Sequence, residues 1–127
     1  MQFNFYIILL SFPLFLIGCG KEDEQVSFSS HSPEGKGLDI FNRMACNACH
    51  SVDGSLKLGP TIKSQYGKEI LHTDGTVMTI NDDYIRESLL NPLKHIAEGY
   101  TPIMPSYRPV LSDDDVNNLI AYIKAIK

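Results

Sequence analysis

The feature that most constrains this chain is the pentapeptide Cys46-Asn47-Ala48-Cys49-His50. Two thiols separated by two residues can add to the two vinyl groups of a haem, and a histidine directly after the second thiol can reach the iron. The spacing therefore predicts one covalently bound haem c, with Cys46 and Cys49 as the thioether residues and His50 as an axial iron ligand.

A second strong signal lies at the N-terminus. Residues 3–17 are almost entirely apolar, and no charged residue precedes Lys21. This run of fifteen residues is shorter than the roughly 20 that span a bilayer as a helix, but it fits the hydrophobic region of a secretory signal. The run ends in Leu16-Ile17-Gly18-Cys19, which resembles the lipobox of bacterial lipoproteins.

The lipobox resemblance implies that residues 1–18 are a lipoprotein signal peptide and that Cys19 receives the lipid after cleavage. The protein is then expected to be exported and held by its lipid on the periplasmic side of a bacterial membrane. An uncleaved anchor helix and an ordinary secretory signal remain open alternatives, and both also imply export.

The rest of the chain predicts one tethered domain. Residues 20–33 are polar and charged, so residues 19–33 are expected to form the lipidated cysteine and a flexible tether, followed by a folded domain over residues 34–127. A chain of 127 residues leaves room for one such domain. The formal charge of −4, from 11 basic and 15 acidic residues without a basic cluster, argues against nucleic acid as a partner.

Three other uses of the cysteine pair compete with haem attachment. A thioredoxin-like redox pair would stand at the start of a helix after a strand, whereas here the pair follows a helical pattern. A structural zinc site needs four ligands, and the other cysteine and histidines lack metal-ligand spacing. A disulfide between Cys46 and Cys49 remains compatible with export. The histidine that follows the pair favours haem.

The predicted elements are mostly helical. Ser32 and Pro33 are typical of a helix start, and apolar residues then recur at helical spacing up to Cys46. Two short runs, residues 69–73 and 76–80, flank Asp74-Gly75 and predict a small β-hairpin.

Capping signals mark two further helices. Asn81 is expected to cap a helix over residues 82–90, which Pro92 ends. Ser112 and Asp115 predict a capping box at the start of the last helix, whose apolar face comprises Val116, Leu119, Ile120 and Ile123.

If the protein supplies a ligand at the sixth coordination position of the iron, the haem is an electron carrier. If that position is free, the haem is an open site that can bind another molecule. Met104 is the favoured ligand, because Pro102 and Pro105 hold its loop extended and lower the entropy lost on presenting one thioether. His95, and after it His72, would give a site with two histidine ligands instead.

Taken together, the pentapeptide, Gly59-Pro60, the loop of Met104 and the amphipathic last helix resemble a class I cytochrome c over residues 34–127. The resemblance implies a mostly α fold, with three to four helices around one haem and a small hairpin. It also implies that the Pro60 carbonyl accepts the ring hydrogen of His50 and so orients it.

The same resemblance implies a close helix crossing. Gly37 and Phe41 match the small and aromatic pair of the first helix of that family, which crosses the last helix near Leu119 and Tyr122. From Gly59 onward, the sequence most resembles the cytochrome c domain fused to subunit II of some haem-copper oxidases.

The expected function is single-electron transfer between respiratory-chain components, with no enzymatic activity of its own. Expected partners are a quinol-oxidising complex as donor and a terminal oxidase as acceptor, and the domain could also be a permanent subunit of such a complex. Two other classes remain open: a haem protein with an open iron site that is peroxidase-like or gas-sensing, and a haem-free thiol or disulfide lipoprotein.

Overall fold

The computed structural model describes residues 27–127. The signal peptide predicted for residues 1–18, the lipidated Cys19 and most of the tether lie outside the described residues. The described part contains α1 (Pro33–Arg43), a 3₁₀ turn η1 (Cys46–Ala48), β1 (Glu69–Leu71), β2 (Val77–Thr79), α2 (Asp82–Leu90) and α3 (Asp113–Ala125). This architecture confirms the predicted mostly α fold with a small hairpin.

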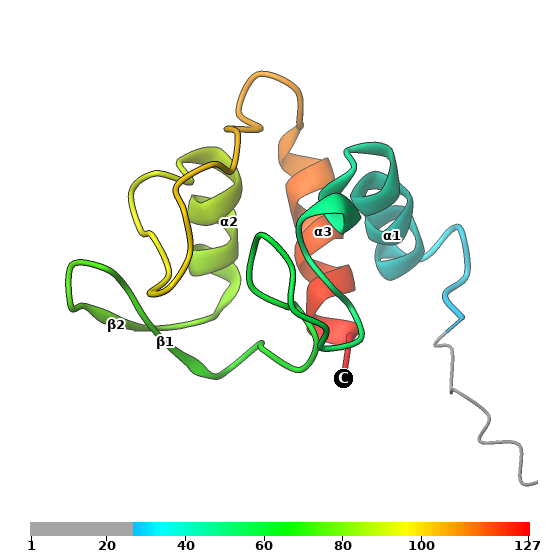
Figure 1. Ribbon diagram of the computed structural model, residues 1–127. Helices are drawn as coiled ribbons and strands as arrows, with labels where there is room; N and C mark the ends of the chain where they lie inside the picture. The colour runs from blue at the N-terminus through cyan, green and yellow to red at the C-terminus, as the bar shows by residue number, and fades with distance from the viewer. Residues whose placement is uncertain (1–26) are drawn as a thin grey trace, which may run out of the picture.

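The other two α-helices, α1 and α2, flank α3 (Figure 1). α1 packs along one side of α3, and α2 lies on the other side, with the hairpin beyond it. The loop after α2 returns over the face of α2 before the chain enters α3. None of the helices within residues 27–127 has the length and apolar character needed to cross a membrane.

The predicted caps begin all three helices. The Ser32 hydroxyl accepts the backbone N–H of Gly35, and the Asn81 side chain accepts a backbone N–H in the first turn of α2. Ser112 and Asp115 form the reciprocal capping box of α3. Each cap satisfies backbone donors that the helix itself leaves unpaired, which is why these short local patterns were sufficient to locate the helix starts.

The end of the first helix differs from the prediction. Helical spacing continues to Cys46, but α1 ends at Arg43, and Ala45 has a φ of 55°. This left-handed conformation cannot continue a right-handed helix. Cys46 therefore begins the separate turn η1.

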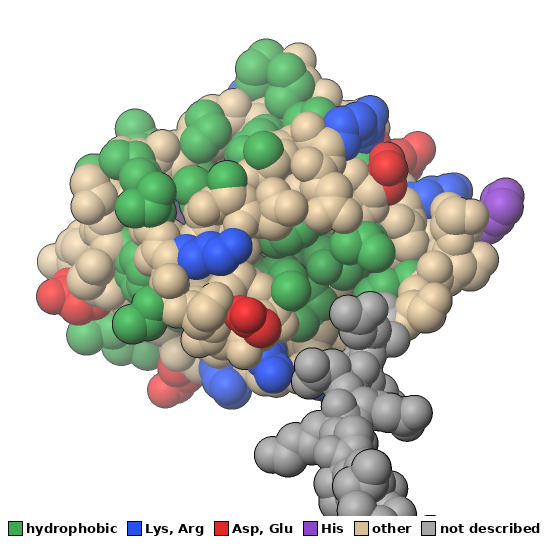
Figure 2. Space-filling model, turned by 45° about the vertical axis from the view of Figure 1, so that its right-hand side comes forward, with side chains coloured by type: hydrophobic (Ala, Val, Ile, Leu, Met, Phe, Trp, Pro, Cys, Tyr) green, Lys and Arg blue, Asp and Glu red, His purple; other side chains and the backbone are tan. Residues whose placement is uncertain are grey.

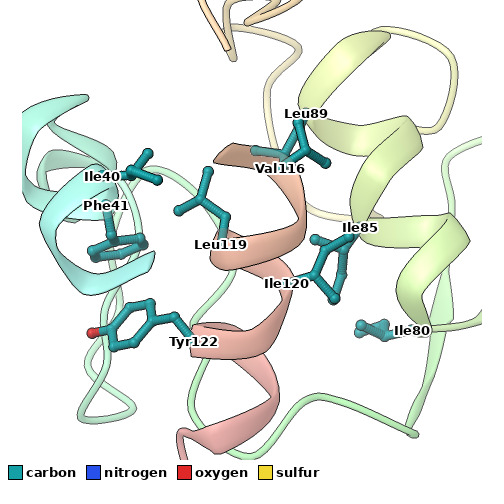
Figure 3. Packing of buried hydrophobic residues seen from close by; sticks show 9 residues of the cluster. All are labelled: Ile40, Phe41, Ile80, Ile85, Leu89, Val116, Leu119, Ile120 and Tyr122. Carbon is teal, nitrogen blue, oxygen red and sulfur yellow. The ribbon is translucent and has the colours of Figure 1, made fainter. Parts of the chain in front are cut away.

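The hydrophobic core is built on both sides of α3. Leu119 points toward Ile40 and Phe41 of α1, while Val116 and Ile120 point toward α2 (Figure 3). The fully buried side chains of the core include Leu119 and Val116, each 1% exposed. Because α3 contributes to both contacts, it connects the two halves of the domain.

Gly37 permits the predicted close approach of α1 to α3. A Cβ at this position would lie 2.6 Å from the Cβ of Tyr122 and would also collide with the backbone of Asn118. Only glycine leaves room for this contact, because real Cβ atoms do not approach other atoms so closely. The helix crossing implied by the sequence resemblance is thus present.

The hairpin and the N-terminal edge complete the fold. β1 and β2 pair antiparallel with Ile70 opposite Met78, and Gly75 occupies the turn with a φ of 81°. At the N-terminal edge, the ring of Phe28 packs edge-on against Tyr122 with centroids 5.8 Å apart. Phe28 lies within residues 19–33, the range predicted as the flexible tether, so the contacts of the folded domain begin inside that range.

Candidate functional site

An apolar cavity of about 220 Å³ lies between the cysteine turn, α2, α3 and the loop before α3. Cys46, Cys49 and His50 line it together with Met104. Met104 is far from the cysteine motif in the sequence, and the fold brings it to the same cavity as the three motif residues. Leu89 of α2 and Leu119 of α3 contribute to its apolar lining.

His50 is held by the backbone of the following loop. Its Nδ1 lies 2.7 Å from the carbonyl oxygen of Pro60. Because that oxygen can only accept, Nδ1 carries the hydrogen and Nε2 keeps its free lone pair. A histidine with one nitrogen bonded to a carbonyl in this way is oriented to use the other nitrogen as a metal ligand.

Gly59 allows the ring of His50 to lie against the loop. A Cβ on Gly59 would stand 2.6 Å from Cε1 and 2.9 Å from Nδ1 of that ring. The Gly59 N–H also donates to the carbonyl of Cys49 at 2.9 Å, so the loop and the cysteine turn are joined directly. Glycine is thus required here for a close approach.

We expect Gly59→Ala to push the ring of His50 away from Pro60 and to lower the free energy of unfolding of the haem-loaded protein by about 1–3 kcal/mol, as in overpacked sites. Denaturant unfolding followed at the haem absorption would measure this. Gly67→Ala is the control, because its Cβ would meet nothing within 4 Å and Gly67 has a φ of 82°, so only backbone strain is added. Equal losses in both variants would contradict the predicted contact with His50.

Cys46 has the environment of an unreactive thiol rather than of a redox centre. Neither Cys46 nor Cys49 is in a disulfide in the described structure. Burial raises the pKa of the Cys46 thiol, and this outweighs the lowering effect of a hydrogen bond with Tyr107. Reactive cysteines of thioredoxin-like pairs have a lowered pKa instead. Across residues 27–127, no group of three or more His, Cys, Asp or Glu is placed to hold a metal ion, as a zinc site would require.

The candidates for a sixth ligand occupy different environments. Met104 is partly buried, packs against the core and lines the cavity. His72 is 1% exposed and is not among the cavity-lining residues, and its Nδ1 and Nε2 are bonded to the Thr76 carbonyl and the Tyr84 hydroxyl at 3.2 and 3.1 Å. His95 lines the cavity. Met104 and His95 therefore remain candidates for the sixth ligand of the iron. His72 is excluded, because it does not line the cavity and both of its ring nitrogens are bonded elsewhere.

Two features of the site were not anticipated from the sequence. Tyr84 lines the cavity and bonds to the buried His72, a pairing across α2 and the hairpin for which the sequence contains no local signal. Leu58 and Ile103 line the cavity although they are 63% and 54% exposed, so the cavity has an apolar rim open to solvent. On the face shown in Figure 2, hydrophobic side chains likewise reach the surface among charges of both signs.

The residues present fit a haem c. The apolar cavity borders both cysteines of the motif, and the histidine that follows them is fixed through Nδ1. A thioether sulfur and an imidazole nitrogen are both established axial ligands of haem iron. His95 also lines the cavity, and its Nδ1 is buried without a hydrogen-bond partner among the described residues.

Comparison with known proteins identifies the family of this chain. A family model described as cytochrome c oxidase, cbb3-type, subunit III matches residues 33–123, which include the cysteine motif and Met104. Cytochrome c oxidase subunit 2 of Alkalihalophilus pseudofirmus is 27% identical over 93 residues, covering 72% of this chain and 25% of that protein. The chain thus spans about a quarter of the length of this relative. The chain belongs to the cbb3-type cytochrome c oxidase subunit III family, a cytochrome c family, and membership implies haem c and electron transfer through it.

Proposed function

We propose that the protein is a membrane-tethered cytochrome with one covalent haem c, which transfers single electrons between respiratory-chain components. The observation that carries this proposal is the convergence of Cys46, Cys49, His50 and Met104 on one apolar cavity. Two thioether residues and two axial ligands are the complete protein contribution to a six-coordinate haem c.

Each of these residues has a separate task. Cys46 and Cys49 attach the haem, whose iron, when bound, gains and loses one electron. Pro60 orients His50 so that its Nε2 would hold the iron, and the sulfur of Met104 would hold it as well. With both ligands supplied by the protein, the iron would have no free position for a substrate, and we expect the domain to have no enzymatic activity of its own. It acts as a carrier or as one subunit of a larger oxidoreductase.

The apolar cavity would favour the reduced state of a bound haem. Its lining includes Leu89 and Leu119, and a low local dielectric would disfavour the additional positive charge of ferric iron. A methionine ligand acts in the same direction, because a thioether raises the reduction potential relative to a second imidazole.

The proposed partners are membrane redox complexes, with a quinol-oxidising complex as donor and a terminal oxidase as acceptor. Similarity to an oxidase subunit and to the cbb3-type subunit III family supports this choice. The apolar N-terminal run and Cys19 support export and a lipid anchor on the periplasmic side of a bacterial membrane. The exposed rim residues Leu58 and Ile103 leave the cavity edge accessible to a partner.

The test is the visible spectrum of the haem-loaded protein before and after Met104→Ala. Ferric haem bound by a methionine sulfur has a weak far-red band, which we expect to vanish in the variant while the reduction potential falls. Met78→Ala in β2 is the matched control, because Met78 does not line the cavity, and it should leave the band unchanged.

Two results would contradict the proposal. A colourless wild type would show that no haem is attached and would favour the haem-free lipoprotein. A coloured wild type whose spectrum is unaffected by Met104→Ala would place the sixth ligand elsewhere, with His95 the next candidate, or would indicate an open iron site.

A further inference from the structure

The two favoured iron ligands are held in different ways. His50 is bonded directly, through Nδ1, to the Pro60 carbonyl at 2.7 Å. The backbone of Met104, in contrast, makes no hydrogen bond within residues 27–127. The position of the Met104 sulfur therefore depends on how the neighbouring residues of its loop are anchored.

The loop of Met104 is anchored to the end of α2. The Tyr107 N–H donates to the Leu89 carbonyl at 2.9 Å, and the Ser106 hydroxyl donates to the Leu90 carbonyl at 2.7 Å. These two bonds fix the loop two and three residues after Met104. They hold it on the α2 side of the cavity and do not join it to the cysteine turn.

The side chain of Tyr107 provides the connection to the cysteine turn. It is partly buried, packs against the core and lines the cavity. Its hydroxyl donates to the carbonyl of Met44, the residue that caps the end of α1, over 3.5 Å. In the part of the chain that the structure describes, no other residue of the loop 99–111 forms a hydrogen bond with residues 44–62.

The same hydroxyl lies beside the thiol of Cys46. Burial raises the pKa of that thiol, and a hydrogen bond with Tyr107 partly offsets the rise. Burial also raises the pKa of Tyr107, and its interaction with Cys46 adds to this. The hydroxyl therefore stays protonated and able to donate. A sulfur remains a weak acceptor when it is part of a thioether, so this contact is compatible with haem attachment.

We propose that Tyr107 is a positioning residue for Met104: by joining the loop to the cysteine turn, its hydroxyl keeps the methionine sulfur at the iron against competing ligands. This inference rests on the proposed function, because it requires Met104 to be an iron ligand. A sulfur that its loop holds close to the metal has a high effective concentration, and removing one attachment of the loop lowers that concentration. An external ligand then competes more successfully for the same position.

The test measures imidazole binding to the ferric form of the full-length, haem-loaded protein by visible absorption. We expect Tyr107→Phe to bind imidazole about two- to tenfold more tightly than the wild type, which corresponds to the loss of one ordinary hydrogen bond. Phenylalanine keeps the aromatic ring in place and removes only the hydroxyl. Without imidazole, the far-red band of the sulfur-bound iron should remain, because Tyr107 is not itself a ligand.

Tyr66→Phe is the matched control. The Tyr66 hydroxyl donates to Asp82 at 2.6 Å, but Tyr66 does not line the cavity. This variant also loses a hydrogen bond of a tyrosine, so an effect of general stability would appear in both variants. We expect its imidazole affinity to equal that of the wild type.

A double variant shows whether Tyr107 acts through Met104. Met104→Ala opens the position at the iron, so imidazole should bind to it more tightly than to Tyr107→Phe. Adding Tyr107→Phe to Met104→Ala should then change the affinity no further, because the two changes act on the same step.

Three outcomes would overturn the inference: wild-type imidazole affinity in Tyr107→Phe, an equal gain in Tyr66→Phe, or the same gain from Tyr107→Phe in the presence and absence of Met104. Failure of the proposed function has a different signature. It would appear as a colourless wild type, or as a Met104→Ala variant that leaves the far-red band and the imidazole affinity unchanged.

Discussion

Replacing Cys46 and Cys49 together by alanine is expected to abolish covalently bound haem completely. The thioether bonds are the only links that survive denaturation, since axial ligands dissociate when the chain unfolds. Mass spectrometry of the denatured protein, together with haem staining after denaturing electrophoresis, would show the wild type heavier by one haem and the double variant lighter by that amount.

The same double variant should also be less stable. Without the cofactor, the apolar cavity of about 220 Å³ is left unfilled. At roughly 24 cal/mol per Å³ of residual cavity, this amounts to about 5 kcal/mol, a large part of the stability of a small domain. The denaturant midpoint should therefore decrease strongly, with collapse of the cavity reducing the loss.

Cys19→Ala is the matched control for the double variant. It removes a cysteine outside the motif, so the protein should keep its haem and its stability, and should lose the lipid that we propose for Cys19. Haem that remained attached to the Cys46/Cys49 double variant after denaturation would contradict the assigned attachment residues.

Gly37→Leu is expected to have the largest effect among substitutions remote from the cofactor. Even a Cβ at this position would lie 2.6 Å from Tyr122 and would strike the backbone of Asn118. Since backbone cannot move aside as a flexible side chain does, α1 and α3 must separate, and we expect the free energy of unfolding to fall by more than about 3 kcal/mol. Thermal unfolding followed by far-ultraviolet circular dichroism would measure this.

Two further variants make the Gly37 prediction specific. Gly37→Ala should show a smaller loss of the same kind, although alanine is the better helix former by about 1 kcal/mol. Lys36→Leu adds the same side chain to the exposed neighbouring position of α1 and should change stability by less than about 0.5 kcal/mol. A Gly37→Leu protein with wild-type stability would refute the close helix crossing.

Local sequence patterns were sufficient for the helix starts and for the hairpin turn. Helix caps at Ser32, Asn81 and Ser112 and the Asp74-Gly75 turn involve groups within a few residues of one another, so the signal and the structure coincide. The same kind of reasoning misplaced the end of α1, because apolar spacing continued past the left-handed Ala45. The spacing of apolar residues indicates which side chains are buried, but it does not indicate the backbone angle at which a helix ends.

For the candidate site, the sequence by itself determined the chemistry that each residue can perform. The cysteine spacing and the following histidine predict haem attachment, and the flanking prolines favour Met104 as the sixth ligand of the iron. The close approach at Gly37 was accessible through family resemblance rather than through any local pattern.

Only the tertiary structure decided which of these residues meet. It placed Met104 and His95 at the cavity of Cys46 and His50, and it engaged both ring nitrogens of His72 with Thr76 and Tyr84. Neither His72 nor His95 lies in a sequence motif, so no local pattern predicts how their environments differ. Their different environments arise from contacts between the hairpin, α2 and the following loop, and such long-range contacts depend on packing of the whole chain rather than on the residues adjacent in sequence.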